Sequence, residues 1–165
     1  MKELIDLVNE HLDEYLQITY PEDIFKAMKY TLMLPGKRLR PVMCLETARI
    51  LGCDIKKVMP AACAIEMLHV QSLIHDDLPC MDNDDFRRGK PSNHKMFGEA
   101  NAVLAGDALL TFAPQLIIEK SKDLSMTQIV RILHEYTKFA GAYGRIDKNL
   151  TIVLYKAVEM TVSDG

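Results

Sequence analysis

Apolar residues recur every three or four positions along most of this chain, which is the spacing of one face of an α-helix. A first helix carries this pattern from the start of the chain, and a second runs from a turn at residues 20–23 to about residue 33. A Pro-Gly pair at residues 35–36 ends the second helix, and a third begins in residues 37–40 and ends at Gly52. The expected apolar face of the first helix consists of Leu4, Leu7, Val8, Leu12, Tyr15 and Leu16.

The longest unbroken helical pattern covers residues 60–77, and Asp54 is placed to cap a helix in this region. Residues 79–97 contain two prolines, a glycine and several Asn and Ser residues, a composition typical of a loop. A further helix is expected from Glu99 into the 110s, and another after Ser125. The apolar face of that last helix would consist of Ile129, Ile132, Leu133 and Tyr136.

These elements predict an all-α fold built as a bundle of long helices. Residues 151–154 have the composition of a strand, but no partner strand is apparent. A chain of 165 residues is long enough for one domain with a sizeable core, and it contains no repeat, linker or low-complexity segment.

Composition narrows the class of protein. The chain has a net charge of −3, few aromatic residues and no long basic stripe, which argues against a nucleic-acid partner. Its four cysteines lack CxxC spacing and favour a reducing compartment. The N-terminus lacks the apolar core of a signal peptide, and no apolar run approaches the length of a membrane span. We therefore expect a cytoplasmic protein that is not an integral membrane protein.

The most unusual stretch reads HDDLPCMDNDDFRRGKPSNH, over residues 75–94, and directly follows an apolar helix. Closely spaced carboxylates repel one another unless a cation lies among them, and oxygen ligands of this kind suit Mg²⁺ or Mn²⁺. The basic residues behind them have the geometry and charge to bind phosphate. A metal–phosphate site is therefore favoured over the alternative of a solvated acidic loop. The stretch contains Asp76, Asp77, Asp82, Asp84 and Asp85, followed by Arg87, Arg88 and Lys90.

A second basic cluster, GKRLRP, occupies residues 36–41 at the expected start of a helix. Helix N-termini favour anions, and Lys37 and Arg40 are expected on one side of the first turn. The alternative is a solvated basic helix end. On the long helix, His69, Ser72 and Asp76 share one face, although a lone His69 is more typical of a hydrogen-bonded core histidine.

Together these residues resemble the trans-isoprenyl diphosphate synthases, which make geranyl, farnesyl and geranylgeranyl diphosphate. The resemblance rests on GKRLRP at 36–41, EMLHVQSLIHDDLPCMDNDDFRRGKPSNHKMFGE at 66–99 and LAGDALL at 104–110. It covers about residues 1–144 and implies the N-terminal half of the isoprenoid synthase fold, in which long helices surround a deep apolar cavity.

The resemblance also implies roles for individual residues. Asp76 and Asp82 would be Mg²⁺ ligands with Asp77 assisting, and they would bind an allylic diphosphate that Arg87 also contacts. Lys37, Arg40, His69 and Arg88 would hold isopentenyl diphosphate. The implied reaction is ionisation of the allylic diphosphate, attack by the isopentenyl double bond and loss of a proton. Gln71 and Ser72 occupy the positions that help set product length in this family.

The resemblance stops after Gly144, which predicts an incomplete synthase-like domain at 1–144 and a divergent tail at 145–165. The family's second aspartate-rich motif and its Gly-Gly-Gln segment do not occur in this sequence. We therefore expect a truncated or frameshifted synthase that is inactive alone. Two alternatives are a regulatory subunit of a full-length synthase and a self-associated half-bundle, so a homodimer or a partner synthase chain is expected. Terpene cyclases use similar metal–diphosphate chemistry, but the pair of basic motifs favours condensation over cyclisation.

Overall fold

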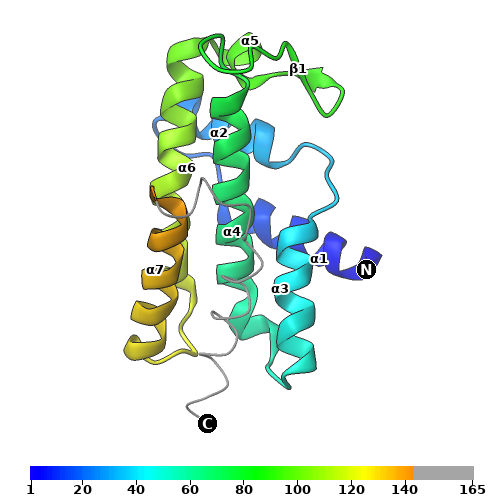
Figure 1. Ribbon diagram of the computed structural model, residues 1–165, viewed down its shortest axis with the longest axis vertical. Helices are drawn as coiled ribbons and strands as arrows, with labels where there is room; N and C mark the ends of the chain where they lie inside the picture. The colour runs from blue at the N-terminus through cyan, green and yellow to red at the C-terminus, as the bar shows by residue number, and fades with distance from the viewer. Residues whose placement is uncertain (143–165) are drawn as a thin grey trace.

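The computed structural model describes residues 1–142, and helices make up most of this part of the chain (Figure 1). The prediction of an all-α fold is confirmed, and strand structure in this part is limited to one short hairpin. The elements are α1 (Lys2–Tyr15), α2 (Glu22–Leu32), α3 (Leu39–Ile50), α4 (Ile55–Asp76), β1 (Phe86–Arg87), β2 (Lys90–Pro91), α5 (Asn93–Phe97), α6 (Glu99–Lys120) and α7 (Met126–Ala140).

Helix α4 forms the centre of the molecule, with α6 and α7 along one side and α3 along the other (Figure 1). It begins at Ile55 rather than at residue 60, because the Asp54 side chain accepts a hydrogen bond from the Lys56 backbone N–H at 2.9 Å. Pro60 lies in the second turn, where a proline removes one backbone hydrogen bond but does not end this helix. Nearly every residue from Val58 to Val70 is buried, which explains the apolar composition of the segment.

Helix α6 packs lengthwise against α4, and its buried positions include the small residues Ala102, Ala105 and Ala113. Small side chains let the two helix backbones approach closely. Within residues 1–142, α6 is also the one helix long and apolar enough to cross a membrane, a test that core helices of soluble proteins pass as well. The expectation that the chain is not an integral membrane protein therefore stays a prediction.

The segment expected to be a loop, residues 79–97, contains local structure. Its strands β1 and β2 pair Phe86 with Pro91 and Arg87 with Lys90. Arg88 and Gly89 form the two-residue turn with φ values of 51° and 77°. Two successive positive φ values are the signature of a type I′ hairpin turn, which matches the twist of the flanking strands. The loop prediction was therefore wrong for the hairpin and for the short helix α5.

Helix α7 confirms the pattern predicted after Ser125. The Ser125 side chain accepts a hydrogen bond from the Gln128 backbone, and the Gln128 side chain bonds back to the Ser125 backbone N–H, which forms a capping box. The expected face is largely buried: Ile129, Ile132 and Tyr136 lie in the core, and Leu133 packs against it. The suggested strand at 151–154 and the tail at 145–165 lie outside the described residues, so the proposed boundary at residue 144 stays a prediction.

Candidate active site

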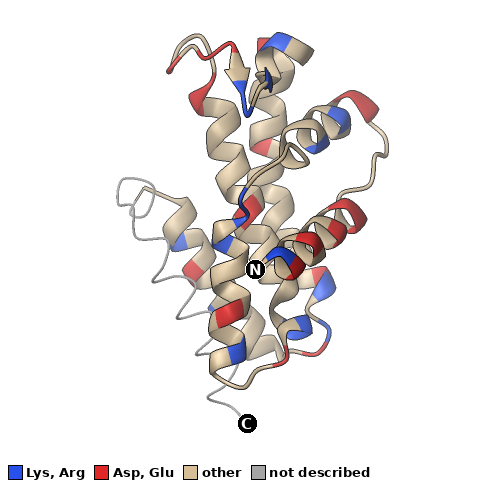
Figure 2. Ribbon diagram, turned by 90° about the vertical axis from the view of Figure 1, so that its right-hand side faces the viewer, with Lys and Arg blue, Asp and Glu red and all other residues tan. Residues whose placement is uncertain are grey.

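The acid cluster lies at one end of the bundle, where α4 finishes at Asp76 (Figure 2). The chain then turns back on itself, because the Asp82 backbone N–H donates to the Asp76 carbonyl oxygen at 2.8 Å. Asn83, with a φ of 54°, completes the turn by donating its N–H to the Leu78 carbonyl at 3.1 Å. This local fold brings the backbones of Asp76 and Asp82 together although six positions separate them.

The neighbouring Asp77 has different surroundings. Its side chain is only 1% exposed and is held by Arg87, whose Nε donates to the two carboxylate oxygens at 3.0 and 3.1 Å. The Arg87 Nη2 also donates to Asp77 Oδ1, and it contacts Asp84 Oδ2 at 3.3 Å. The hydrogen bond that Arg87 donates to the Asp77 carboxylate raises the pKa of Arg87. The hairpin is therefore attached to the end of α4 by a charged, two-pronged contact.

The oxygen donors at this end fit Mg²⁺ bound together with a phosphorylated ligand. Among residues 1–142, no three His, Cys, Asp or Glu side chains are close enough to form a metal site by themselves. Mg²⁺ is typically held by one or two carboxylates plus substrate phosphate oxygens, so a complete protein cage is not required. Asp76, which is half-buried, and Asp82, which is exposed, are available for this role, whereas the Asp77 carboxylate is occupied by Arg87.

A cavity of about 390 Å³ adjoins Asp76. Its walls are mostly apolar, and His75 on its rim is fixed by hydrogen bonds to Val103 O at 3.1 Å and to Gln71 Nε2 at 3.0 Å. A Cβ atom at Gly106 would overlap the His75 ring, so the glycine of LAGDALL permits this contact between α4 and α6. The cavity is lined by His75, Asp76, Leu78, Cys80, Met81 and Val103.

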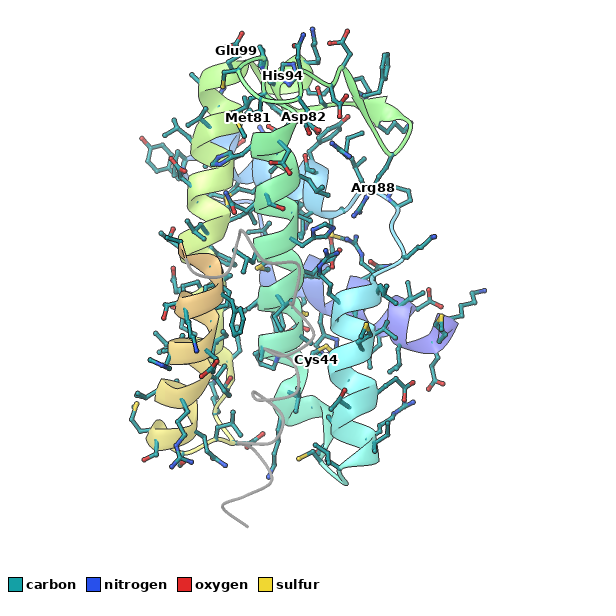
Figure 3. The ribbon with its side chains drawn as sticks, in the orientation of Figure 1. Cys44, Met81, Asp82, Arg88, His94 and Glu99 are labelled. Carbon is teal, nitrogen blue, oxygen red and sulfur yellow. The ribbon has the colours of Figure 1, made fainter. Side chains whose placement is uncertain are left out.

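The four residues expected to hold isopentenyl diphosphate line a second cavity, of about 410 Å³. They come from separate segments: Lys37 from the loop before α3, Arg40 from the first turn of α3, His69 from α4 and Arg88 from the hairpin turn. Because α3 begins at Leu39, Lys37 precedes the helix, and its predicted place in the first turn was wrong. Arg88 nevertheless reaches the same cavity, on the side of the loop leading into α3 and away from Asp82 (Figure 3).

The charges in this second cavity are arranged to receive an anion. Burial, followed by the nearby charge of Arg40, lowers the pKa of His69 to about 4, so the imidazole is neutral at pH 7 and adds no charge to the cavity. The Arg88 Nη1 donates to the Leu34 carbonyl at 3.1 Å, which orients its guanidinium over Gly36. A Cβ at Gly36 would lie only 2.8 Å from Arg88 Cζ, so the Arg88 guanidinium can occupy this place only beside a glycine.

Sequence reasoning missed Arg38 and Glu66, which also line this cavity. Arg38, with a φ of 46°, turns its side chain inward and forms a buried ion pair with Glu66 at 2.9 Å. Its guanidinium also donates to the carbonyl of Leu32 at 2.7 Å, to that of Leu34 at 3.2 Å and to Asn9 Oδ1 at 2.8 Å. The signal that could have identified this pair is the single acidic residue within the otherwise apolar stretch of α4.

The expected chain-length positions are Gln71 and Ser72. They lie on α4 between His69, which lines the basic cavity, and Asp76, which lines the apolar cavity. Gln71 is 1% exposed and bonded to His75, and its Oε1 makes no hydrogen bond within residues 1–142. The Ser72 hydroxyl donates to the His69 carbonyl at 2.7 Å. Their effect on product length stays a prediction.

Comparison with known proteins identifies the family. The Polyprenyl synthetase family model matches residues 21–143. The heterodimeric geranylgeranyl pyrophosphate synthase large subunit 1 of Arabidopsis thaliana is 52% identical, over 86% of this chain and 38% of that protein. The farnesyl diphosphate synthase of Geobacillus stearothermophilus is 50% identical, over 84% of this chain and 48% of that protein.

A solved structure of a related synthase has the same fold as this chain. The FPP/GFPP synthase of Zymomonas mobilis has a TM-score of 0.88 and 28% identity, over 98% of this chain and 69% of that one. This chain spans less than half the length of the two curated relatives. The helical fold, the two motifs that form the site and these similarities agree, and the chain belongs to the polyprenyl synthetase family.

Proposed function

We propose that this chain provides two diphosphate sites for a prenyltransferase that condenses isopentenyl diphosphate with an allylic diphosphate. The acid cluster and Arg87 would bind the allylic diphosphate, and the basic cavity would bind isopentenyl diphosphate. The names of the curated relatives, which are geranylgeranyl and farnesyl diphosphate synthases, support this reaction class.

One observation carries the proposal. Lys37, Arg40, His69 and Arg88 are separated in sequence by as many as fifty-one positions, yet they line one cavity. The hairpin that supplies Arg88 to this cavity supplies Arg87 to the aspartates. Two anion sites that share a hairpin suit a reaction between two diphosphate substrates better than a reaction of one.

The residues would divide the chemistry as follows. Asp76 and Asp82 would hold Mg²⁺, which neutralises charge on the departing pyrophosphate. Arg87 would add its own charge and hydrogen bonds to that leaving group. Lys37, Arg40 and Arg88 would fix the second substrate by its diphosphate. The apolar walls beside Asp76 would keep water from the allylic cation.

Turnover tests the proposal directly. The purified 165-residue chain would be incubated with Mg²⁺, labelled isopentenyl diphosphate and geranyl or dimethylallyl diphosphate, beside an Asp76→Ala control. Mg²⁺-dependent prenyl product that is absent from the control would support catalysis by this chain. Absence of product and of Mg²⁺-dependent pyrophosphate binding would refute the proposal.

A second candidate is a non-catalytic subunit that acts on a full-length synthase. The name of the Arabidopsis relative includes the word heterodimeric, which supports a partner chain for this family member. In that case the chain would bind pyrophosphate but form no product alone, and it would change the rate or product length of an added synthase. Analytical ultracentrifugation, alone and with that synthase, would distinguish a homodimer from a mixed complex.

A further inference from the structure

The two adjacent aspartates at the end of α4 are not equivalent. Asp76 is half-buried and lines the apolar cavity, whereas the Asp77 side chain is 1% exposed, does not line that cavity and is paired with Arg87 of the hairpin. A metal ion that binds together with a substrate needs carboxylate ligands that the ion and the substrate can both reach from solvent. The burial of Asp77 therefore sets it apart from Asp76 and Asp82.

The partner of Asp77 defines its role. Arg87 presents its Nε and Nη2 edge to the two carboxylate oxygens, with Nε distances of 3.0 and 3.1 Å. Within residues 1–142, the remaining amino group, Nη1, makes no hydrogen bond. Holding one edge of a planar guanidinium fixes the direction of the other donors, because the fork is rigid.

We infer that Asp77 is a positioning residue, not a metal ligand: it holds Arg87 so that the free Nη1 edge faces a diphosphate bound beside Asp76 and Asp82. This inference rests on the proposed function for its ligand. Moving the Asp77 carboxylate to a metal would break its contacts with Arg87 and release the hairpin from α4. The arrangement thus assigns metal binding and arginine orientation to different carboxylates of one Asp-Asp pair.

The first test observes Arg87 without any ligand. In the wild-type chain, the Arg87 Nε–H should give a resolved ¹⁵N NMR signal that exchanges slowly with water, and Arg87→Lys would assign it. Asp77→Asn should make this proton exchange much faster. Asp85→Asn is the matched control, because it removes the same charge from the same end of the molecule, but the partner of Asp85 is Lys95, at 2.8 Å.

The second test is a double-mutant cycle on the affinity for inorganic pyrophosphate with Mg²⁺, measured by calorimetry on variants shown to be folded by circular dichroism. Asp77→Asn and Arg87→Gln should each weaken binding by about tenfold or more, and the double variant should lose no more than Arg87→Gln alone. Electron paramagnetic resonance of Mn²⁺ bound with pyrophosphate should show the wild-type number of ions in Asp77→Asn and fewer in Asp76→Asn.

The outcomes separate the inference from the proposed function. Additive losses, or a missing Mn²⁺ ion in Asp77→Asn, would make Asp77 a ligand and overturn the inference. A wild-type Arg87 Nε–H that exchanges as fast as in Asp77→Asn would also overturn it, even if pyrophosphate binds. A protected Arg87 in a protein that binds no pyrophosphate would instead refute the proposed function, and with it the diphosphate as the target of Arg87.

Discussion

At the scale of single residues, His69 is expected to control how the basic cavity responds to pH. Burial and then Arg40 penalise its charged form and lower its pKa from 6.5 to about 4. The unfolded chain therefore binds a proton more readily than the folded one between these values. The contribution of His69 to stability is complete above pH 6.5 and is lost as the pH falls toward 4.

NMR titration of His69 should give a midpoint near pH 4 in the free protein and a higher midpoint with pyrophosphate bound, since a nearby anion favours the imidazolium. Urea unfolding should show that His69→Gln loses less stability than the wild type between pH 7 and pH 5. A His69 midpoint near 6.5 in the free protein would contradict the burial that the structure gives this ring.

At Gly36, the absence of a Cβ atom leaves room for the Arg88 guanidinium. In Gly36→Ala the new methyl group would displace the Arg88 guanidinium, which is the end of a flexible side chain, so stability should change little. Affinity for isopentenyl diphosphate should fall by roughly tenfold, because the Arg88 guanidinium leaves its place in the cavity. Calorimetry on Gly36→Ala, Arg88→Gln and the double variant checks this. A double variant that binds more weakly than Arg88→Gln would show that Gly36 acts through some other residue.

At the scale of elements, the β1–β2 hairpin connects the two sites through adjacent arginines. Its turn requires a positive φ at Gly89, 77°, which costs an L-residue about 1–2 kcal/mol. Gly89→Ala should therefore lower the free energy of unfolding by about 1 kcal/mol and weaken binding of both pyrophosphate and isopentenyl diphosphate.

The matched control for this prediction is Gly52→Ala in the turn between α3 and α4. Gly52 has a φ of 76°, and a Cβ there meets nothing within 4 Å, as at Gly89. It should lose similar stability in urea unfolding and keep both affinities. If Gly89→Ala and Gly52→Ala lose equal affinity, then general destabilisation of the fold, and not a change in the hairpin, would explain the weaker binding.

At the scale of the whole molecule, Arg38 connects three helices and the loop that carries Lys37. It contacts Asn9 in α1, the Leu32 carbonyl at the end of α2, the Leu34 carbonyl in the loop and Glu66 in α4. Arg38→Met would leave the Glu66 carboxylate buried without its partner. Removing one member of a buried ion pair typically costs about 3–5 kcal/mol, so a large loss in the free energy of unfolding is expected.

Chemical denaturation would measure this effect beside two other variants. Arg38→Met with Glu66→Leu should recover part of the loss, because no uncompensated charge remains. Lys26→Met, which breaks the exposed pair with Glu22, should change stability little. An Arg38→Met variant as stable as Lys26→Met would show that the buried pair is unimportant for the fold.

The sequence alone determined the class of fold, the order of most helices and the residue types of the site. These features are local: helical periodicity, the Asp54 and Ser125 caps and the motif around Asp76 depend on residues within a few turns of one another. Where prediction failed locally, in the hairpin, the turn needed a positive φ at Arg88, a residue type that gives no such signal.

Tertiary structure alone decided which of these residues meet. Composition could not tell that Asp77 is buried against Arg87 while Asp76 borders a cavity, because both have the same side chain and adjacent positions. Likewise, Arg38 and Arg40 stand two positions apart in one basic motif and line one cavity, yet Arg38 is buried and paired with Glu66 whereas Arg40 is only half-buried. Burial depends on the helices packed around a residue, and that packing is set by the whole chain.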